Sequence, residues 1–205
     1  MEKFAVLKGV AAPLMLANVD TDCIIPMERL TRYSRGELGP WAFESLRYLA
    51  DGSANPQFVL NQTPWRGAQI LLAAENFGCG SSRETAVWAL WEIGLRCVIA
   101  PSFGDIFYGN CFQNGMLPLR LPAAEVEALA TEARRGAGEI TVDLQAQRIV
   151  TVTGRTIAFD IDPGRREALL QGLDAIGQTL RHAAKIDAFQ ARERERRPWL
   201  YREPR

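Results

Sequence analysis

The sequence predicts a mixed α/β domain built in three layers. The first signal is a strand–loop–helix–strand unit between residues 69 and 100, in which two apolar runs flank a glycine loop and a helical pattern. That order is typical of a βαβ unit. The second signal lies between residues 140 and 161, where three short runs rich in β-branched residues are separated by turn residues. They predict hairpins at the edge of the sheet.

Strands are expected where a short apolar run is bounded by turn-forming residues. In the first 121 residues such runs are Phe4–Leu7, Phe58–Leu60, Ile70–Ala74, Cys97–Ala100 and Leu117–Leu121. The hairpin strands are expected at Ile140–Leu144, Arg148–Thr153 and Thr156–Ile161.

Helical periodicity is clearest at Arg83–Gly94, at Ala123–Arg135 and from Arg165 to Arg196. Gly94 and Pro122 stand where a helix end and a helix start are expected. A further stretch, residues 101–118, carries Phe103, Phe107 and Phe112 near helical spacing, which predicts core; its Asn110 and Asn114 are not required by such a core.

Composition excludes several function classes. Lys plus Arg and Asp plus Glu number 24 each, so no net charge draws the chain to nucleic acid or to a membrane, and we expect neither partner. No apolar run approaches the roughly 20 residues of a membrane span. Glu2, Lys8 and Pro13 interrupt the apolar N-terminus, unlike a signal peptide, so a cytoplasmic protein is expected.

Cysteine and histidine usage predicts no metal site in this chain. Its four cysteines, Cys23, Cys79, Cys97 and Cys111, form no C-x-x-C pair and show no zinc or iron–sulfur spacing. They fit reduced thiols. The single histidine is His182.

The glycine-serine loop "NFGCGSSRE", residues 76–84, is where chemistry is expected. Ser81 to Glu84 read as a capping box, with Ser81 as the cap and Glu84 folded back on it. Backbone N–H groups, a helix dipole and the Arg83 fork would together bind a carboxylate or a phosphate. A capped helix with a surface arginine is the simpler alternative.

Other loop chemistries fit poorly. Arg83 stands where a dinucleotide fingerprint needs its third glycine, and no G-K-[ST] follows for a P-loop. A serine nucleophile needs a base, and His182 lies about 100 residues away in a polar stretch. A second polar cluster, "NVDTDCIIP" at residues 18–26, reads as an Asx-rich turn, without an EF-hand pattern.

Four stretches together resemble the small-subunit family of 3-isopropylmalate dehydratases, the swivel-domain relatives of aconitase. They are "NVDTDCIIP" (18–26), "ENFGCGSSRE" (75–84), "IAPSFGDIFYGNCFQNGMLP" (99–118) and "GLDAIGQTL" (172–180), in the family's order and spacing. The resemblance implies a three-layer β/β/α swivelling domain like aconitase's fourth, with a mixed sheet and peripheral hairpins, over residues 1–190. Residues 191–205 would form a charged tail, either solvated or docked on a partner.

The resemblance also implies an activity. The family are hydro-lyases that interconvert 2- and 3-isopropylmalate in leucine biosynthesis by removing and re-adding water. Loss of hydroxide needs a Lewis acid, a 4Fe–4S cluster in aconitase-like enzymes. In the bacterial members the cluster belongs to a separate large subunit, so this chain would bind no cofactor, would pair with that subunit and would act on an alkylmalate.

By the same resemblance Ser81 aligns with the catalytic base. Arg83, Thr21 and Asp22 align with residues near the substrate, and Ser82 lies beside them.

Two departures from the family pattern leave alternatives open. Thr85 stands where the family usually has histidine, and Arg29 replaces an aromatic residue in the loop after Pro26. That loop helps to choose the substrate's side group, which makes Arg29 and Thr31 candidate substrate-binding residues. An arginine suits an isopropyl group poorly unless it points away. The alternatives are a related hydro-lyase acting on methylmalate or dimethylmalate, and a non-catalytic scaffold of the large subunit.

Overall fold

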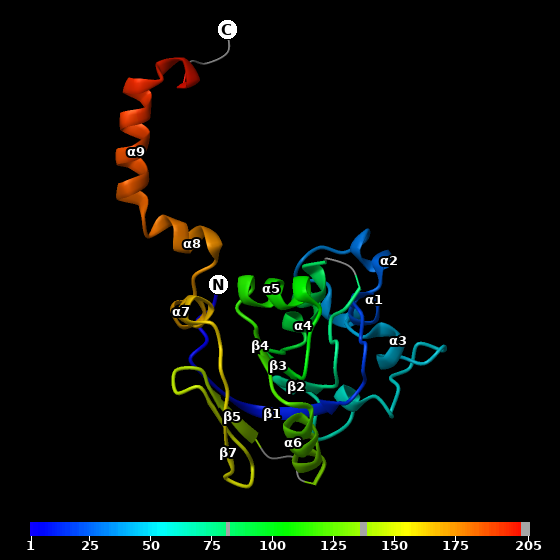
Figure 1. Ribbon diagram of the computed structural model, residues 1–205. Coiled ribbons are helices and arrows are strands. Elements are labelled where there is room, and N and C mark those ends of the chain that lie inside the picture. The colour runs from blue at the N-terminus through cyan, green and yellow to red at the C-terminus, as the bar shows by residue number, and fades with distance from the viewer. Residues whose placement is uncertain (81–82, 136–138, 202–205) are drawn as a thin grey trace.

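The computed structural model describes residues 1–80, 83–135 and 139–201 (Figure 1). Its described residues form a seven-stranded sheet of order β4-β3-β2-β1-β5-β6-β7. The strands are β1 (Val6–Leu14), β2 (Ile70–Ala73), β3 (Cys97–Ala100), β4 (Leu117–Arg120), β5 (Glu139–Asp143), β6 (Arg148–Val150) and β7 (Thr156–Ala158). Strands β1 to β4 are parallel, and β5 to β7 join antiparallel, so the predicted mixed sheet with peripheral hairpins is confirmed.

Strand β1 links the two halves of the sheet. Its residues 11–14 pair with β2, while residues 6–10 pair with β5. The strand predicted at Phe4–Leu7 is therefore longer than expected, since β1 runs from Val6 to Leu14. Lys8 is exposed in the antiparallel half, whereas residues 11–14 are buried. A parallel sheet covered on both faces needs such continuous apolar strands.

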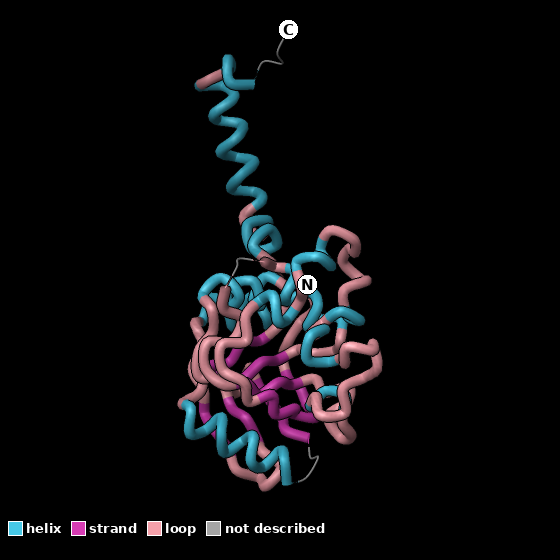
Figure 2. The backbone as a smooth tube through the Cα atoms, turned by 90° about the vertical axis from the view of Figure 1, so that its right-hand side faces the viewer, coloured by secondary structure: helices cyan, strands magenta, loops and turns pink. Residues whose placement is uncertain are grey.

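Helices cover both faces of the parallel half (Figures 1 and 2). They are α1 (Thr21–Ile24), α2 (Met27–Leu30), α3 (Glu44–Arg47), α4 (Thr85–Glu92), α5 (Asp105–Gln113), α6 (Ala123–Arg135), α7 (Pro163–Gln171), α8 (Ala175–Leu180) and α9 (Ala183–Arg196), with short 3₁₀ turns η1 (Gly39–Trp41), η2 (Val59–Asn61) and η3 (Pro198–Tyr201).

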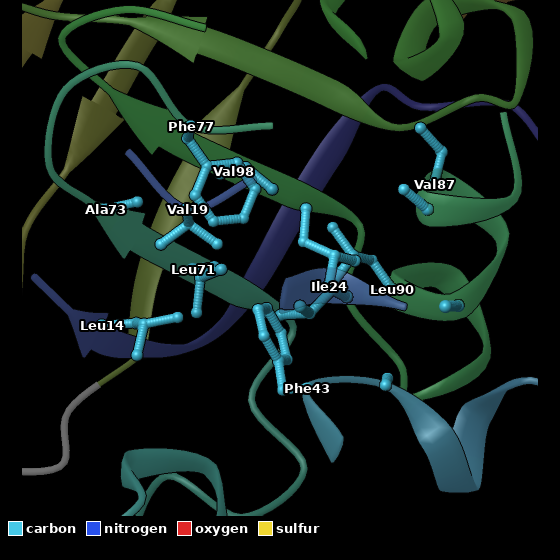
Figure 3. Packing of buried hydrophobic residues seen from close by; sticks show 14 of the residues in the cluster. Leu14, Val19, Ile24, Phe43, Leu71, Ala73, Phe77, Val87, Leu90 and Val98 are labelled. Atoms are coloured by element: carbon cyan, nitrogen blue, oxygen red, sulfur yellow. The ribbon is translucent and has the colours of Figure 1, made fainter. Parts of the chain in front are cut away.

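Alternate side chains of one strand enter two different cores. Leu71 of β2 packs with Ile24, Phe43 and Leu90 on the α1 and α4 side (Figure 3). Its neighbour Leu72 packs on the other face, with residues of α6 and of β5 to β7. The shared second core means that the sheet curls, so that its antiparallel half and α6 enclose one apolar volume. This alternation follows from the two-residue period of a strand.

Several predicted elements are wrong or need new bounds. Phe58–Leu60 is not a strand; η2 occupies that stretch. Strands β6 and β7 end at Val150 and Ala158, earlier than predicted. The long predicted helix from Arg165 is three helices, because Gly172 adopts a left-handed φ of 71° at the end of α7 and Asp174 caps α8.

The predicted boundary at residues 190/191 falls inside α9, which continues to Arg196. The division into a domain and a tail there stays a prediction. Among the described residues, no helix combines the length and the apolar composition needed to cross a bilayer.

Candidate active site

Three loops meet at the carboxyl ends of β1, β2 and β3. The backbone of Asp20 pairs with that of Cys79, and the Thr21 amide donates to the Cys79 carbonyl at 3.0 Å. Phe77 pairs in the same way with Phe103 from the third loop. In open α/β sheets this edge is where ligands bind. The topology therefore brings "NVDTDCIIP", the glycine loop and the start of residues 101–118 together.

Glycine is required in this loop by close packing. Gly78 has a φ of 71°, and a Cβ there would lie 2.3 Å from the Phe107 ring. A Cβ on Gly104 would lie 2.5 Å from the Gly78 carbonyl oxygen. Phe107 stacks on Phe103, and both are buried, as predicted for the aromatic residues of this stretch. The glycines therefore allow the loop backbone to pack directly on the Phe103 and Phe107 rings. A cavity of about 260 Å³ lies beside this contact.

Asp22 and Arg83, both predicted site residues, form a forked ion pair. The two Arg83 Nη atoms donate to Asp22 Oδ1 at 2.7 Å and to Oδ2 at 3.2 Å. The Arg83 side chain is 15% exposed and that of Asp22 59%. Asp22 is held in the first turn of α1, whose N-cap Asp20 accepts from the Cys23 amide at 2.6 Å. The pair uses two of the five guanidinium N–H groups, so a second donor edge is not taken up by Asp22.

Thr21 is buried against the same loop. A Cβ on Gly80 would lie 3.6 Å from Thr21 Oγ1, so the backbone of the glycine loop passes directly over this hydroxyl. Ser81 and Ser82, the predicted base and its neighbour, lie outside the described residues. In sequence they stand between Gly80 and Arg83, both of which contact the Asp20–Asp22 segment.

Arg29 and Thr31 have their partners elsewhere. Arg29 Nε donates to Glu44 Oε2 at 2.7 Å, a second bond joins Nη2 to Glu44 Oε1, and the guanidinium lies 3.9 Å from the centre of the Trp41 ring. Hydrogen bonding to Glu44 raises the pKa of Arg29. Thr31 Oγ1 donates to the Glu28 carbonyl at 3.0 Å. Within the described part of the chain, neither side chain is bonded to the Asp22–Arg83 pair, and their role in substrate binding stays a prediction.

Asn114 is a residue whose role sequence reasoning missed. It is 8% exposed, and its Nδ2 donates to Glu84 Oε1 at 2.8 Å and to the Asn110 carbonyl at 2.9 Å. Its Oδ1 accepts from Trp88 Nε1 at 2.9 Å. The sequence signal that could have found it is its polar side chain within the aromatic stretch 101–118, where a purely apolar core would not need an asparagine. Through Glu84, Asn114 holds the residue next to Arg83.

The predicted capping box involves Ser81, which lies outside the described residues, so only its Glu84 half can be followed. Helix α4 begins at Thr85, and Glu84 is its N-cap without a side-chain cap bond. The Glu84 carboxylate accepts from Asn114, because a buried amide needs an acceptor. Thr85, which stands where the family usually has histidine, has a buried Oγ1 without a hydrogen-bond partner among the described residues.

Asn114→Leu is expected to destabilise the chain by about 2 kcal/mol, because Trp88 Nε1 and Glu84 would lose their partner in a largely buried site. Thermal melts should show the transition about 4–8 °C lower. Gln113→Leu changes the exposed neighbour on the same helix and serves as the control. An unchanged transition for Asn114→Leu would contradict the structural role assigned to this network.

The cysteines do not fit a metal cluster. Cys97 and Cys111 are buried, and burial raises the pKa of both thiols. The pKa of Cys23 is also raised, first by burial and then by Asp20. Within residues 1–80, 83–135 and 139–201, no three His, Cys, Asp or Glu side chains gather as a metal site.

Comparison with known proteins places the chain in a family. Residues 1–124 match the aconitase C-terminal domain, residues 127–163 the LeuD N-terminal model, and residues 176–203 the C-terminal domain of the 3-isopropylmalate dehydratase small subunit. The 3-isopropylmalate dehydratase small subunit of Gluconacetobacter diazotrophicus is 55% identical over 203 residues, covering 98% of each chain. That of Rhodospirillum centenum is 56% identical over 200 residues, covering 97% of this chain and 98% of the relative.

A solved structure agrees with these relatives. The crystal structure of 3-isopropylmalate dehydratase (leuD) from Methanocaldococcus jannaschii matches with a TM-score of 0.64 at 27% identity, covering 92% of this chain and 99% of the other. The swivel-domain fold expected from the resemblance is thereby confirmed. On the strength of these full-length matches and of the shared fold, the chain belongs to the 3-isopropylmalate dehydratase small-subunit family, within the aconitase superfamily of swivel domains.

Proposed function

We propose that this chain is the small subunit of a 3-isopropylmalate dehydratase, a hydro-lyase that interconverts 2- and 3-isopropylmalate in leucine biosynthesis. The observation that carries the proposal is the match, at 55–56% identity and nearly full length, to curated subunits of that name. The forked Asp22–Arg83 pair at the loop edge supports it, because a dicarboxylate substrate needs a cation there.

In this proposal Arg83 binds a substrate carboxylate with the donor edge that Asp22 does not use. Asp22 holds the guanidinium plane through two charge-assisted bonds, and the Arg83 side chain itself is largely buried. Thr21 packs against the Gly80 backbone and so helps to position the glycine loop.

Ser81 would act as the base that removes the substrate proton, with Ser82 beside it in the site. The assignment rests on the family motif and on the chain positions of these serines between Gly80 and Arg83. An alkoxide needs donors and positive charge nearby, and Arg83 is a suitable source of both.

The Lewis acid that hydroxide loss needs would be a 4Fe–4S cluster on a large subunit, because the described cysteines of this chain do not fit a cluster. We place the large subunit over the cavity beside Gly78 and Gly80, where it would exclude water from the site. Free thiols and the biosynthetic role are consistent with a cytoplasmic enzyme.

The pairing of Arg29 favours an isopropyl side group over a smaller or more polar one. The Arg29 guanidinium forms an ion pair with Glu44 and stacks on the Trp41 ring. It therefore does not present an unpaired positive charge to a substrate pocket. The reason for preferring methylmalate or dimethylmalate is thereby weakened.

The test is to produce the chain with its cognate large subunit under anaerobic conditions and to assay a panel of alkylmalates. We expect activity with isopropylmalate highest, and none from the isolated chain. A preference for methylmalate or dimethylmalate would identify a related hydro-lyase, and an assembled but inactive complex would support a scaffold.

Glu44→Gln should change substrate choice, because it leaves the Arg29 charge without its carboxylate partner. If the loop after Pro26 lines the side-group pocket, kcat/KM for isopropylmalate relative to a more polar analogue should fall roughly tenfold. Glu28→Gln alters an exposed carboxylate of α2 next to Arg29 and is the control. An unchanged ranking of substrates for Glu44→Gln would place Arg29 outside the pocket.

A further inference from the structure

The C-terminal arm, residues 175–201, extends away from the rest of the molecule (Figures 1 and 2). It consists of α8, α9 and η3. All residues of α9 are exposed except Ile186 and Glu193. The arm leaves the body at a defined place, because Gly172 closes α7 and Asp174 Oδ1 accepts from the Gly177 amide at 2.6 Å.

The tip of the arm is a folded unit. The turn η3 packs back on α9, the Arg197 amide donates to the Glu193 carbonyl at 2.7 Å, and Arg194 lies 5.5 Å from the Tyr201 ring centre. This contact presents Trp199 and Leu200 at the end of the arm while leaving both exposed. A single helix of 14 residues is marginal in water without tertiary packing. The arm therefore needs a surface that covers it.

The exposed apolar side chains of the arm are large enough for an interface. Six of them are 45% to 70% exposed: Ile176, Leu180, Phe189, Trp199, Leu200 and Tyr201. Six large side chains at this exposure supply a substantial part of the about 800 Å² that each partner contributes to a standard protein interface. Aromatic residues are also the type enriched at the centres of interfaces.

The family comparison favours one occupant. The aconitase C-terminal domain model ends at residue 124, whereas the arm falls in a separate segment, residues 176–203, matched by a model specific to the small subunits. Relatives align over 98% of this chain, so the arm belongs to the part shared with other small subunits. A C-terminal domain is joined covalently to the rest of its chain, but a separate subunit needs an added surface to hold its partner.

We propose that the arm docks this chain on its large subunit by placing its apolar side chains in an apolar groove with an acidic rim. The inference rests on the proposed function, which supplies the partner. The charge of the rim follows from the arm, which carries six basic and three acidic residues, a net charge of +3 in a chain of net charge zero. Opposite charges across an interface speed association and make it sensitive to salt.

The experiment uses the full-length chain and measures its Kd for the cluster-loaded large subunit. Leu180→Ser with Phe189→Ser, and separately Trp199→Ser, should each raise Kd at least tenfold, while kcat at saturating large subunit stays within twofold of the unaltered chain. Val152→Ser, on the β6–β7 hairpin and 44% exposed, is the matched control and should leave Kd unchanged. Raising the salt concentration should weaken binding of the unaltered chain.

The possible failures can be told apart. An unaltered Kd for both arm variants overturns the docking role and leaves the proposed function standing. If the arm variants leave Kd unchanged but alter the self-association of the free chain in sedimentation, the docking role is also overturned, and the arm instead contacts a second copy of this chain. An unaltered chain that neither binds nor activates the large subunit overturns the proposed function, and the arm's role falls with it.

Discussion

Ser81→Ala is expected to lower kcat of the assembled enzyme by about 10²–10⁴-fold, the range for a positioned acid–base group. KM should change little, because the substrate carboxylate contact proposed for Arg83, and its bond to Asp22, would both remain. A serine hydroxyl is a weak base in water, so this role needs the nearby N–H groups, the Arg83 charge and a cleft dried by the large subunit. Steady-state kinetics on the assembled enzyme measure the effect.

Thermal melts of the same preparation separate catalysis from stability. If Ser81 served only to cap a helix, its loss would cost about 1 kcal/mol and leave kcat nearly intact. Helix α4 begins at Thr85 and has Glu84 as its N-cap, so we expect Ser81→Ala to remove little helix-capping energy. Ser53→Ala, in an exposed loop between α3 and η2, is a control for serine removal as such. A destabilised complex with normal kcat would remove Ser81 from the catalytic role.

Arg83→Lys is expected to reduce kcat/KM at least tenfold, or about 1.4 kcal/mol. The charge is kept, but an ammonium cannot make the forked bonds that Asp22 receives at 2.7 and 3.2 Å while also binding a substrate carboxylate. Arg83→Ala, which removes the charge as well, should cost about 10²–10³-fold, since each hydrogen bond to a charged group is worth about 1.5–3 kcal/mol.

Two further variants sharpen this prediction. Asp22→Asn keeps the shape of the partner but weakens the hold on the guanidinium, so KM should rise more than kcat falls. Arg134→Lys, on α6 and paired with Glu127 at 3.7 Å, is the control for arginine replacement on another face. Near-normal kinetics for Arg83→Lys would leave Arg83 with a structural role only, as the ion-pair partner of Asp22.

Local patterns predicted much of the fold. Cys97–Ala100 and Ala123–Arg135 have the predicted bounds, because a short apolar run between turn residues and an apolar face of period 3.6 are decided by neighbouring residues. Other bounds depended on distant partners. The second half of β1 pairs with β2, about 60 residues away, and the apolar residues 59 and 60, predicted as strand, lie in η2.

The sequence by itself determined the fold class, the family and the short list of polar residues that surround the glycine loop. Only the tertiary structure decided which of them meet: Asp22 with Arg83, Arg29 with Glu44, and Asn114 with Glu84. The physical reason is that a side chain's partner depends on strand order and on how closely two loops pack. Gly78 and Gly104 allow that close approach, but the residues next to them in sequence do not specify which loop packs against them.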